Sequence, residues 1–287
     1  MESIPIQVMD RTTTLGFVNT QPTEFSRLLR LWRDHARLSQ QALAAEAGVS
    51  QRHLSFLETG RARPGAHVVD RLGEALRLPL RDRNRLQAAA GLAPRHAEMR
   101  LDDSQIAPFR SAVRRLLRSH EPYPAFVIDR WWNIVDANDA ARRLFPAPAG
   151  GVLNAVEAFL APGGLRGTVV NFPEVASMYL RRLRAEVVES ADARLDAILA
   201  RATELLADVE LDEVTSSDDL VVCPRLRVGD EIISTVTMVA RFGATREVTL
   251  DELRVELIYP ADATADAYFR RVGAVNQPDE PRSGHAR

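Results

Sequence analysis

Several residue types are scarce in this sequence, and each shortage excludes a class of protein. Cys223 is the single cysteine among 287 residues, so the chain cannot form an internal disulfide and is not a disulfide-stabilised secreted scaffold. We expect this thiol, which follows two valines in an apparent strand, to pack in a core and not to act as a redox switch. All 37 basic residues are arginine, and the absence of lysine by itself predicts no function.

Long apolar runs and histidine are scarce as well. No run approaches the roughly 18 apolar residues of a membrane span, and the acidic start MESIPIQVMDR is unlike a signal peptide, so we expect a cytoplasmic protein without membrane contact. None of the six histidines lies between residues 121 and 284, which excludes a histidine-ligated haem or metal site there. The sequence contains no G-x-G-x-x-G, P-loop, G-x-S-x-G or H-E-x-x-H motif. We therefore predict no enzyme, no catalytic residues, no metal and no required cofactor.

The composition is that of an ordinary globular protein, but charge is distributed unevenly along the chain. Hydrophobic residues make up 46% and charged residues 26%, and the length fits two domains of about 100–200 residues each. Residues 24–100 carry 14 arginines against 8 acids, a net charge of +6. Residues 101–287 carry 22 arginines against 29 acids, a net of −7, and residues 1–23 add −1. The basic end predicts a module that binds a polyanion.

The basic region has the periodicity of short helices. Phe25, Leu28, Leu29 and Trp32 share one face of a helix over about residues 24–37, and similar stripes predict four more helices up to about residue 90. Thr23 and Ser39 are suited to cap the first two helices, and Gly48 is suited to end the second. We therefore predict a five-helix domain over residues 24–92, preceded by an N-terminal arm at 1–23.

The segment LSQQALAAEAGVSQRHLSFLETGRARP resembles the repressor-like, xenobiotic-response-element (XRE) family of DNA-binding domains. An early glutamine, the AGVS turn, the L-x-x-L spacing and E-x-G-R followed by proline are all in register with that family. The resemblance implies a helix-turn-helix whose second helix enters the major groove of DNA. The alternative is that this helix packs against a protein partner.

The resemblance also implies roles for individual residues. Arg52 is suited to bind guanine and Gln51 adenine, while Phe56, where the family usually has a polar residue, is suited to contact a thymine methyl. The resemblance further implies that Arg33 pairs with Glu58 beneath the recognition helix. The predicted base contacts are Gln51, Arg52, Ser55 and Phe56, the predicted phosphate contacts are Ser39, Gln40, Arg61 and Arg63, and the predicted scaffold is Arg33, Gly48 and Glu58.

The remainder predicts a connector followed by a mixed domain. In the connector, residues 93–121, a helix with Phe109, Val113 and Leu117 on one side either packs on the second domain or forms a dimer contact. Short strands at 125–129 and 133–137, helices within 138–207 and three Val/Ile-rich segments after residue 220 predict about five antiparallel strands with helices on one face. The fold class is thus α + α/β, with the second domain over 122–272 and a polar tail at 273–287.

The order of these elements resembles a PAS-like domain, and more closely the ligand-binding domain of MmyB-like transcription regulators. The segments PAFVIDRWWNIVDANDAARRLF, NFPEVA and RVELIYPAD carry this resemblance over about residues 106–270, together with Asn154. Trp132 and Asn138 fall where the family has its tryptophan and asparagine. The family's histidine–proline pair is absent, and VVCPRL stands in its place.

The second resemblance implies a pocket for a small apolar effector, either uncharged or fatty-acid-like, with an unidentified arginine or asparagine at its head group. The same residues would also suit a plain hydrophobic core. The predicted lining is Phe126, Ile128, Trp132, Ile134, Phe159, Met178, Tyr179, Leu183 and Met238.

Together these features predict a homodimeric regulator that binds double-stranded DNA at two half-sites, about one helical turn (~10 base pairs) or a multiple of it apart. An effector in the second domain would modulate operator binding. The alternative is a C-terminal domain that only dimerises or binds protein, without any ligand.

Overall fold

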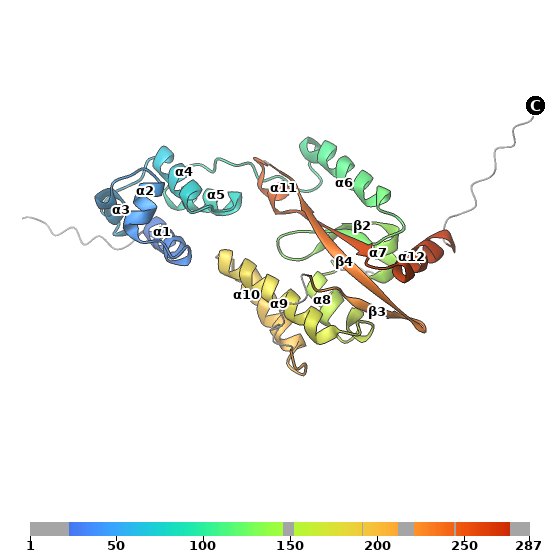
Figure 1. The fold of residues 1–287 in the computed structure, drawn as a ribbon. Coiled ribbons are helices and arrows are strands. Elements are labelled where there is room, and N and C mark those ends of the chain that lie inside the picture. Colours follow the sequence, from blue (N-terminus) through green and yellow to red (C-terminus); the bar gives the residue numbers. More distant parts are fainter. Residues whose placement is uncertain (1–22, 146–151, 191, 212–220, 244, 276–287) are drawn as a thin grey trace, which may run out of the picture. The chain divides into compact units, whose positions relative to one another are not determined.

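The computed structural model describes residues 23–145, 152–190, 192–211, 221–243 and 245–275 of the chain. These residues form two compact units, residues 23–78 with 85–93, and residues 79–84 with 94–275 (Figure 1). Each unit is described by itself below. The predicted arm before Thr23 and most of the predicted tail lie outside the described residues.

The first unit is the predicted five-helix domain. Thr23, Ser39 and Ser50 cap the first three helices, because each side-chain oxygen accepts a hydrogen bond from a backbone N–H three residues later. Six leucines that are fully shielded from solvent form the centre of its core: Leu29, Leu43, Leu54, Leu57, Leu72 and Leu86. The helices are α1 (Glu24–His35), α2 (Gln40–Glu46), α3 (Gln51–Glu58), α4 (Ala66–Ala75) and α5 (Leu80–Ala89), of which α5 belongs to this unit from Arg85 onward.

Gly48 makes the turn between α2 and α3 possible. Its φ of +59° is a left-handed conformation that glycine adopts without strain. Its N–H donates to the carbonyl of Ala45 at 3.1 Å, and the N–H of Val49 donates to that of Ala44 at 2.9 Å, a Schellman ending of α2. A side chain at Gly48 would also collide with the guanidinium of Arg71.

A buried carboxylate joins the first three helices. Glu58, at the end of α3, is only 1% exposed. Arg33 of α1 donates to it from Nε at 2.6 Å and from Nη2 at 3.1 Å, and Gln40 of α2 donates from Nε2 at 2.8 Å. These charge-assisted bonds satisfy the carboxylate, and the bond to Glu58 contributes most to raising the pKa of Arg33. The orientation of α3 therefore depends on one acidic side chain.

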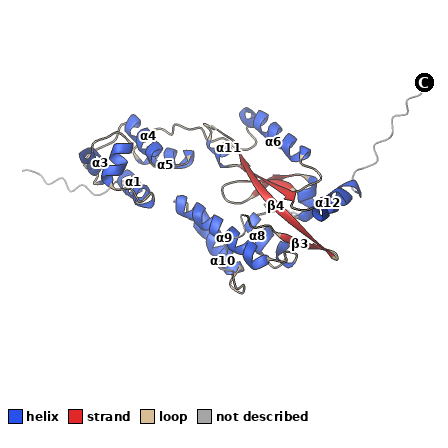
Figure 2. Ribbon diagram, viewed as in Figure 1, coloured by secondary structure: helices blue, strands red, loops and turns tan. Residues whose placement is uncertain are grey.

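The second unit contains a five-stranded antiparallel sheet in the order β2-β1-β5-β4-β3 (Figure 2). The number of strands and their antiparallel pairing confirm the prediction. The strands are β1 (Ala125–Ile128), β2 (Ile134–Ala137), β3 (Arg225–Val228), β4 (Glu231–Arg241) and β5 (Arg254–Pro260).

Helices cover both faces of this sheet. Phe126, Ile128 and Ile258 lie in a core with side chains of α7 to α10. Val127 and Leu257 point the opposite way and pack with side chains of α6 and α11. The remaining elements are η1 (Ser104–Ile106), α6 (Ala107–Ser119), α7 (Asp139–Leu144), α8 (Ala155–Leu160), η2 (Leu165–Gly167), α9 (Phe172–Glu189), α10 (Ala193–Leu205), α11 (Val248–Glu252) and α12 (Ala263–Val275).

Three details differ from the sequence prediction. Helices are predicted on one face of the sheet only, whereas α6 covers the second face; its burial of Val113 and Leu117 there confirms the alternative in which the connector helix packs on the second domain. The segment LDELRVELIYP is not one strand, because its first residues belong to α11, whose start is capped by Glu247. Cys223 lies before β3 and is half-buried, so it is not a buried strand residue.

Asn138 joins three elements of the second unit. Its Oδ1 accepts the N–H of Ala125 in β1 and the N–H of Ala141 in α7, both at 2.9 Å. Its Nδ2 donates to the carbonyls of Leu117 at 3.2 Å and Tyr123 at 2.8 Å. The predicted cap of α7 is therefore also the contact that holds the end of α6 against β1.

We predict that Asn138→Ala destabilises the second unit by about 3 kcal/mol, because it removes four hydrogen bonds at a buried site and leaves the N–H groups of Ala125 and Ala141 and the carbonyl of Tyr123 without this partner. Urea unfolding of the full chain, followed by tryptophan fluorescence of this unit, measures the loss. Asp139→Ala is the matched control, since the Asp139 side chain is 84% exposed. Equal stability of the two variants would contradict the role given to Asn138.

We predict that Glu58→Ala lowers the stability of the first unit by about 3–5 kcal/mol, because the partly buried guanidinium of Arg33 loses its carboxylate. Amide hydrogen exchange of α1 and α3 in the full chain, read by mass spectrometry, should accelerate strongly. Glu46→Ala, which removes an exposed carboxylate of α2, should leave the exchange unchanged.

Candidate functional site

The outer face of α3 carries the four residues predicted to contact bases. Gln51 and Arg52 are exposed, and Ser55 and Phe56 are half-buried. The opposite face of the helix, which includes Leu54, is buried in the core. The core therefore positions α3 so that a short polar and aromatic face is presented to solvent.

Arg52 has a free charge on this face. Its guanidinium carbon lies 5.4 Å from the centre of the Phe56 ring, within range of a cation–π contact. Within the described part of the chain it has no carboxylate partner. The ring of Phe56 thus holds the guanidinium near the start of α3 and leaves its N–H donors available. Guanine accepts such a planar pair of N–H donors at its O6 and N7 atoms.

The predicted phosphate contacts divide into two groups. Arg61 and Arg63 follow α3, are exposed, and have no carboxylate partner among the described residues. Ser39 caps α2, and its hydroxyl accepts the N–H of Ala42 at 3.1 Å. Gln40 is placed differently from the expectation, since its amide donates to the buried Glu58 and thus belongs to the scaffold. No local pattern in the sequence shows a contact across 18 residues.

A small cavity lies in the core of the second unit, and we call it the core cavity. Its volume is about 30 Å³, roughly the size of one water molecule. Of the nine predicted lining residues, Phe126, Phe159 and Tyr179 line it. The other walls are Leu144, Phe145, Leu165, Val169, Val175, Pro224, Leu226, Thr235, Thr237 and Ile258.

Aromatic rings crowd one end of the core cavity. Phe159 lies 4.8 Å from Phe145, 4.9 Å from Tyr179 and 6.2 Å from Phe126, measured between ring centres. Phe145, which sequence analysis did not include, also contacts Phe126 edge to face at 5.5 Å. Such rings bury much apolar surface, so this end of the cavity is lined by aromatic side chains.

Tyr179 is an aromatic lining residue of the cavity that also carries a polar group. Burial raises the pKa of the Tyr179 phenol, so the hydroxyl stays neutral and can donate a hydrogen bond. It has no hydrogen-bond partner among the described residues. A neutral donor on the wall of an apolar cavity is suited to a polar group of a bound molecule.

Buried charges surround Trp132 beside Tyr179. The guanidinium carbons of Arg182 and Arg254 lie 5.1 and 5.3 Å from the centre of the Trp132 ring, within range of cation–π contacts. Its Nε1 donates to Glu186 at 2.7 Å, and its φ of +64° is a strained backbone conformation. The tryptophan predicted to line a pocket is therefore fixed inside an ion cluster and does not line the core cavity.

The ion cluster is balanced. Arg182 donates to Glu256 at 2.6 Å, and Arg254 pairs with Glu186. Arg254 and Glu256 are each only 3% exposed, and burial lowers the pKa of Arg254 despite its carboxylate partner. Two arginines and two glutamates leave no net charge, so this cluster positions α9 and is not by itself a binding site for an anion.

The other predicted lining residues lie elsewhere. Ile128 and Leu183 are buried, and Met178 is half-buried, in the same core. Met238 does not line a pocket in this core: it is 58% exposed and pairs with Leu257, whose side chain points to the opposite face of the sheet. Strand alternation places Thr237, the preceding residue, on the cavity side.

A separate hollow of about 470 Å³ lies at the edge strand β2, and Ile134 is one of its walls. Phe126 and Phe145 line both this hollow and the core cavity. These two rings therefore stand between the cavity and the surface.

Among the described residues, no group of three or more histidine, cysteine, aspartate or glutamate side chains is placed to hold a metal ion. Nor does any helix in the described part of the chain have the length and apolar character required to cross a membrane.

Known proteins were compared with the whole chain. No curated protein matches it. One similar solved structure is titled "Structure of an RNA-binding Light-Oxygen-Voltage Receptor". That match has 14% identity, covers 89% of this chain and 64% of that one, and has a TM-score of 0.22, so it carries no argument.

Two family matches agree with the two units. Residues 24–86 match the helix-turn-helix domain, and residues 109–272 match the MmyB-like transcription regulator ligand binding domain. The second match covers more than half of the 287 residues. The chain therefore belongs to the MmyB-like transcription regulators, with a helix-turn-helix domain before the ligand-binding domain.

Proposed function

We propose that this regulator binds its operator through the outer face of α3 and that an apolar effector in the core cavity modulates the binding. The observation that carries the proposal is the exposed pair Gln51 and Arg52, whose donors are free at the start of a rigidly held helix. Arg52 contacts guanine and Gln51 adenine, with Ser55 and Phe56 beside them. Arg61 and Arg63 bind phosphates.

The regulator acts as a homodimer on two half-sites, because one α3 spans only a few base pairs. The supporting surface is on α6. Phe109 and Leu116 are 43% and 39% exposed, while Val113 and Leu117 on the adjacent face are buried. Helix α6 thus packs on its own domain with one stripe and offers a second apolar stripe to the same helix of a second copy.

The effector is a small apolar molecule such as a fatty acid. The aromatic and aliphatic walls favour an alkyl chain, and the free hydroxyl of Tyr179 is placed to bind the head group. A cavity of about 30 Å³ is too small for such a chain, so binding requires Phe145 and Phe159 to move. This movement favours one of two arrangements of the domains, which differ in the spacing of the two recognition helices, and thereby changes the affinity for the operator.

We predict that Arg52→Ala removes preference for the guanine it contacts, a loss of about 1–3 kcal/mol for the specific site. Arg61→Ala, which removes a phosphate contact, weakens binding to all sequences equally and lowers the salt slope by about 1. Sites selected from random duplex DNA by the full-length protein provide the targets. Partner binding that is insensitive to salt and to both substitutions would favour the protein-binding alternative.

We predict that Thr237→Phe abolishes fatty-acid binding, because the added ring fills the core cavity. Met238→Phe, on the next residue and the opposite face of β4, retains binding. Native mass spectrometry of the full-length protein with a series of saturated fatty acids measures both. No binding by the wild-type protein at any chain length would favour a C-terminal domain that only dimerises.

A further inference from the structure

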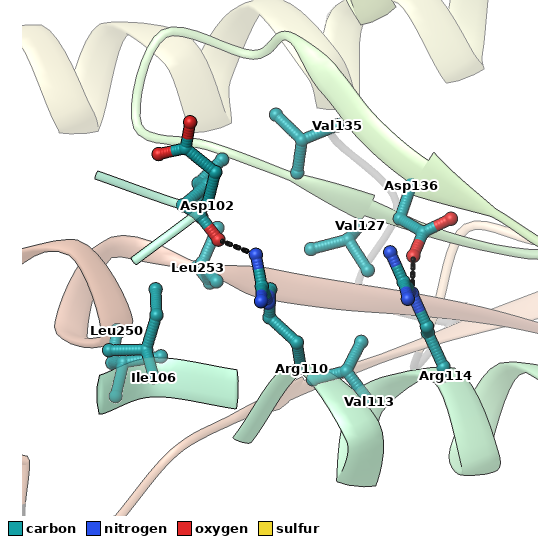
Figure 3. A pocket seen from close by; sticks show the side chains of 11 residues that line it. Asp102, Ile106, Arg110, Val113, Arg114, Val127, Val135, Asp136, Leu250 and Leu253 are labelled. Carbon is teal, nitrogen blue, oxygen red and sulfur yellow. Dashed lines mark hydrogen bonds and ion pairs between the residues drawn. The ribbon is translucent and has the colours of Figure 1, made fainter. Parts of the chain in front are cut away.

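A second concavity lies on the α6 side of the sheet, away from the core cavity, and we call it the α6 groove (Figure 3). It encloses about 250 Å³ between α6, β1, β2 and the segment before η1. Val127 at its base points away from the core cavity, because its neighbours Phe126 and Ile128 face the opposite core. The lining residues are Leu101, Asp102, Ile106, Arg110, Val113, Arg114, Val127, Val135, Asp136, Leu250 and Leu253.

The base of the α6 groove is apolar. Ile106, Val113, Val127 and Leu253 belong to one packed cluster and are each less than 10% exposed. Their packing keeps the base rigid. A ligand with an apolar body therefore has a preformed surface to cover.

Two arginines on successive turns of α6 overhang this base. Arg110 and Arg114 are four residues apart, so they stand on one side of the helix, and Figure 3 shows both reaching across the groove. Arg110 is half-buried and donates from Nη1 to the carbonyl of Leu101 at 2.7 Å. In the described part of the chain no ion pair neutralises it. Arg114 is 63% exposed and lies 3.6 Å from Asp136, a loose contact.

The two acids of the groove already have other partners. Asp102 accepts two hydrogen bonds from Arg100, at 3.0 and 3.2 Å, and these bonds are the main cause of its lowered pKa. Asp136 accepts a hydrogen bond from Arg142 at 3.2 Å. The charged lining of the groove, two arginines and two aspartates, is therefore neutral in sum, but Arg110 has no ion pair among the described residues. Its guanidinium has N–H groups left to donate to an anion beside the apolar base.

We propose that the α6 groove binds a small organic carboxylate with a compact apolar body, separate from the effector of the core cavity. Arg110 and Arg114 bind the carboxylate as charge-assisted donors, and Arg114 exchanges its loose contact with Asp136 for the ligand. The apolar body covers Val113, Val127 and Leu253. A volume of about 250 Å³ suits a single ring or a short branched chain.

The test uses phenylacetate as the probe and the full-length protein, with affinity measured by titration calorimetry. Wild-type protein should bind it saturably, and the uncharged phenylacetamide should bind at least tenfold more weakly. The double variant Arg110→Gln, Arg114→Gln should lose at least tenfold in affinity, as expected for two charge-assisted hydrogen bonds. Arg118→Gln is the matched control, because Arg118 is an exposed arginine of the same helix outside the groove, and it should change affinity less than twofold.

Two further measurements keep the α6 groove distinct from the core cavity. Thr237→Phe, which fills the core cavity, should leave phenylacetate binding unchanged, and a saturated long-chain acid should not compete with it. Circular dichroism of each variant establishes that it is folded. Three outcomes would each overturn the proposal. The wild-type protein does not bind phenylacetate saturably, the folded double variant keeps wild-type affinity, or Thr237→Phe abolishes phenylacetate binding. The first two outcomes leave the core cavity as the effector site unaffected, whereas a probe excluded by Thr237→Phe would place phenylacetate in the core cavity.

Discussion

The second unit depends on a sheet whose central strands are buried on both faces. All four residues of β1 are buried, as are the first five of β5. Because neighbouring side chains in a strand point to opposite faces, these two strands supply two separate cores. Phe126 and Ile258 belong to the core with the cavity, and Val127 and Leu257 to the core beneath the α6 groove. One short stretch of sequence thereby supports two hollows of different character.

Charges buried on the cavity side determine where α9 lies. Arg254 and Glu256 project from β5 into a region shielded from solvent, which is unfavourable unless both are paired. Arg182 and Glu186 of α9 are one helical turn apart and supply both partners. Sliding α9 by one turn would separate both pairs, so the cluster fixes its register. That register also places Tyr179 over the core cavity.

Much of the architecture could be predicted because periodic patterns carry it. The five helices of the first unit, the caps at Thr23 and Ser39, and the five strands all follow from local spacing. The alternation of side chains along a strand shows which residues share a face of the sheet, but not which face adjoins the cavity. Met238 was therefore predicted on the wrong side of the sheet. Helices on both faces were missed for the same reason.

The unpredicted parts of the sites are contacts over long sequence separations. Arg254 and Glu256 alternate with apolar residues, a pattern typical of a strand with one solvated face, yet α9 covers that face. Gln40 begins a helix, where a phosphate contact is common, yet its partner is Glu58. Phe145 lies at the end of a short helix, and its role appears only when Phe126 and Phe159 are placed around it. Local patterns contain no information on such partners.

Arginine is the only long cationic side chain in this protein, and its pKa keeps it charged at any physiological pH. A missing carboxylate partner does not by itself mark a binding residue, since the exposed Arg118 also lacks one. The surroundings decide what an unpaired arginine can bind. Arg52 stands on a convex helix face, supported by a ring, and suits the floor of a groove in DNA. Arg110 stands half-buried beside an apolar concavity, where reduced solvation strengthens its attraction for a carboxylate.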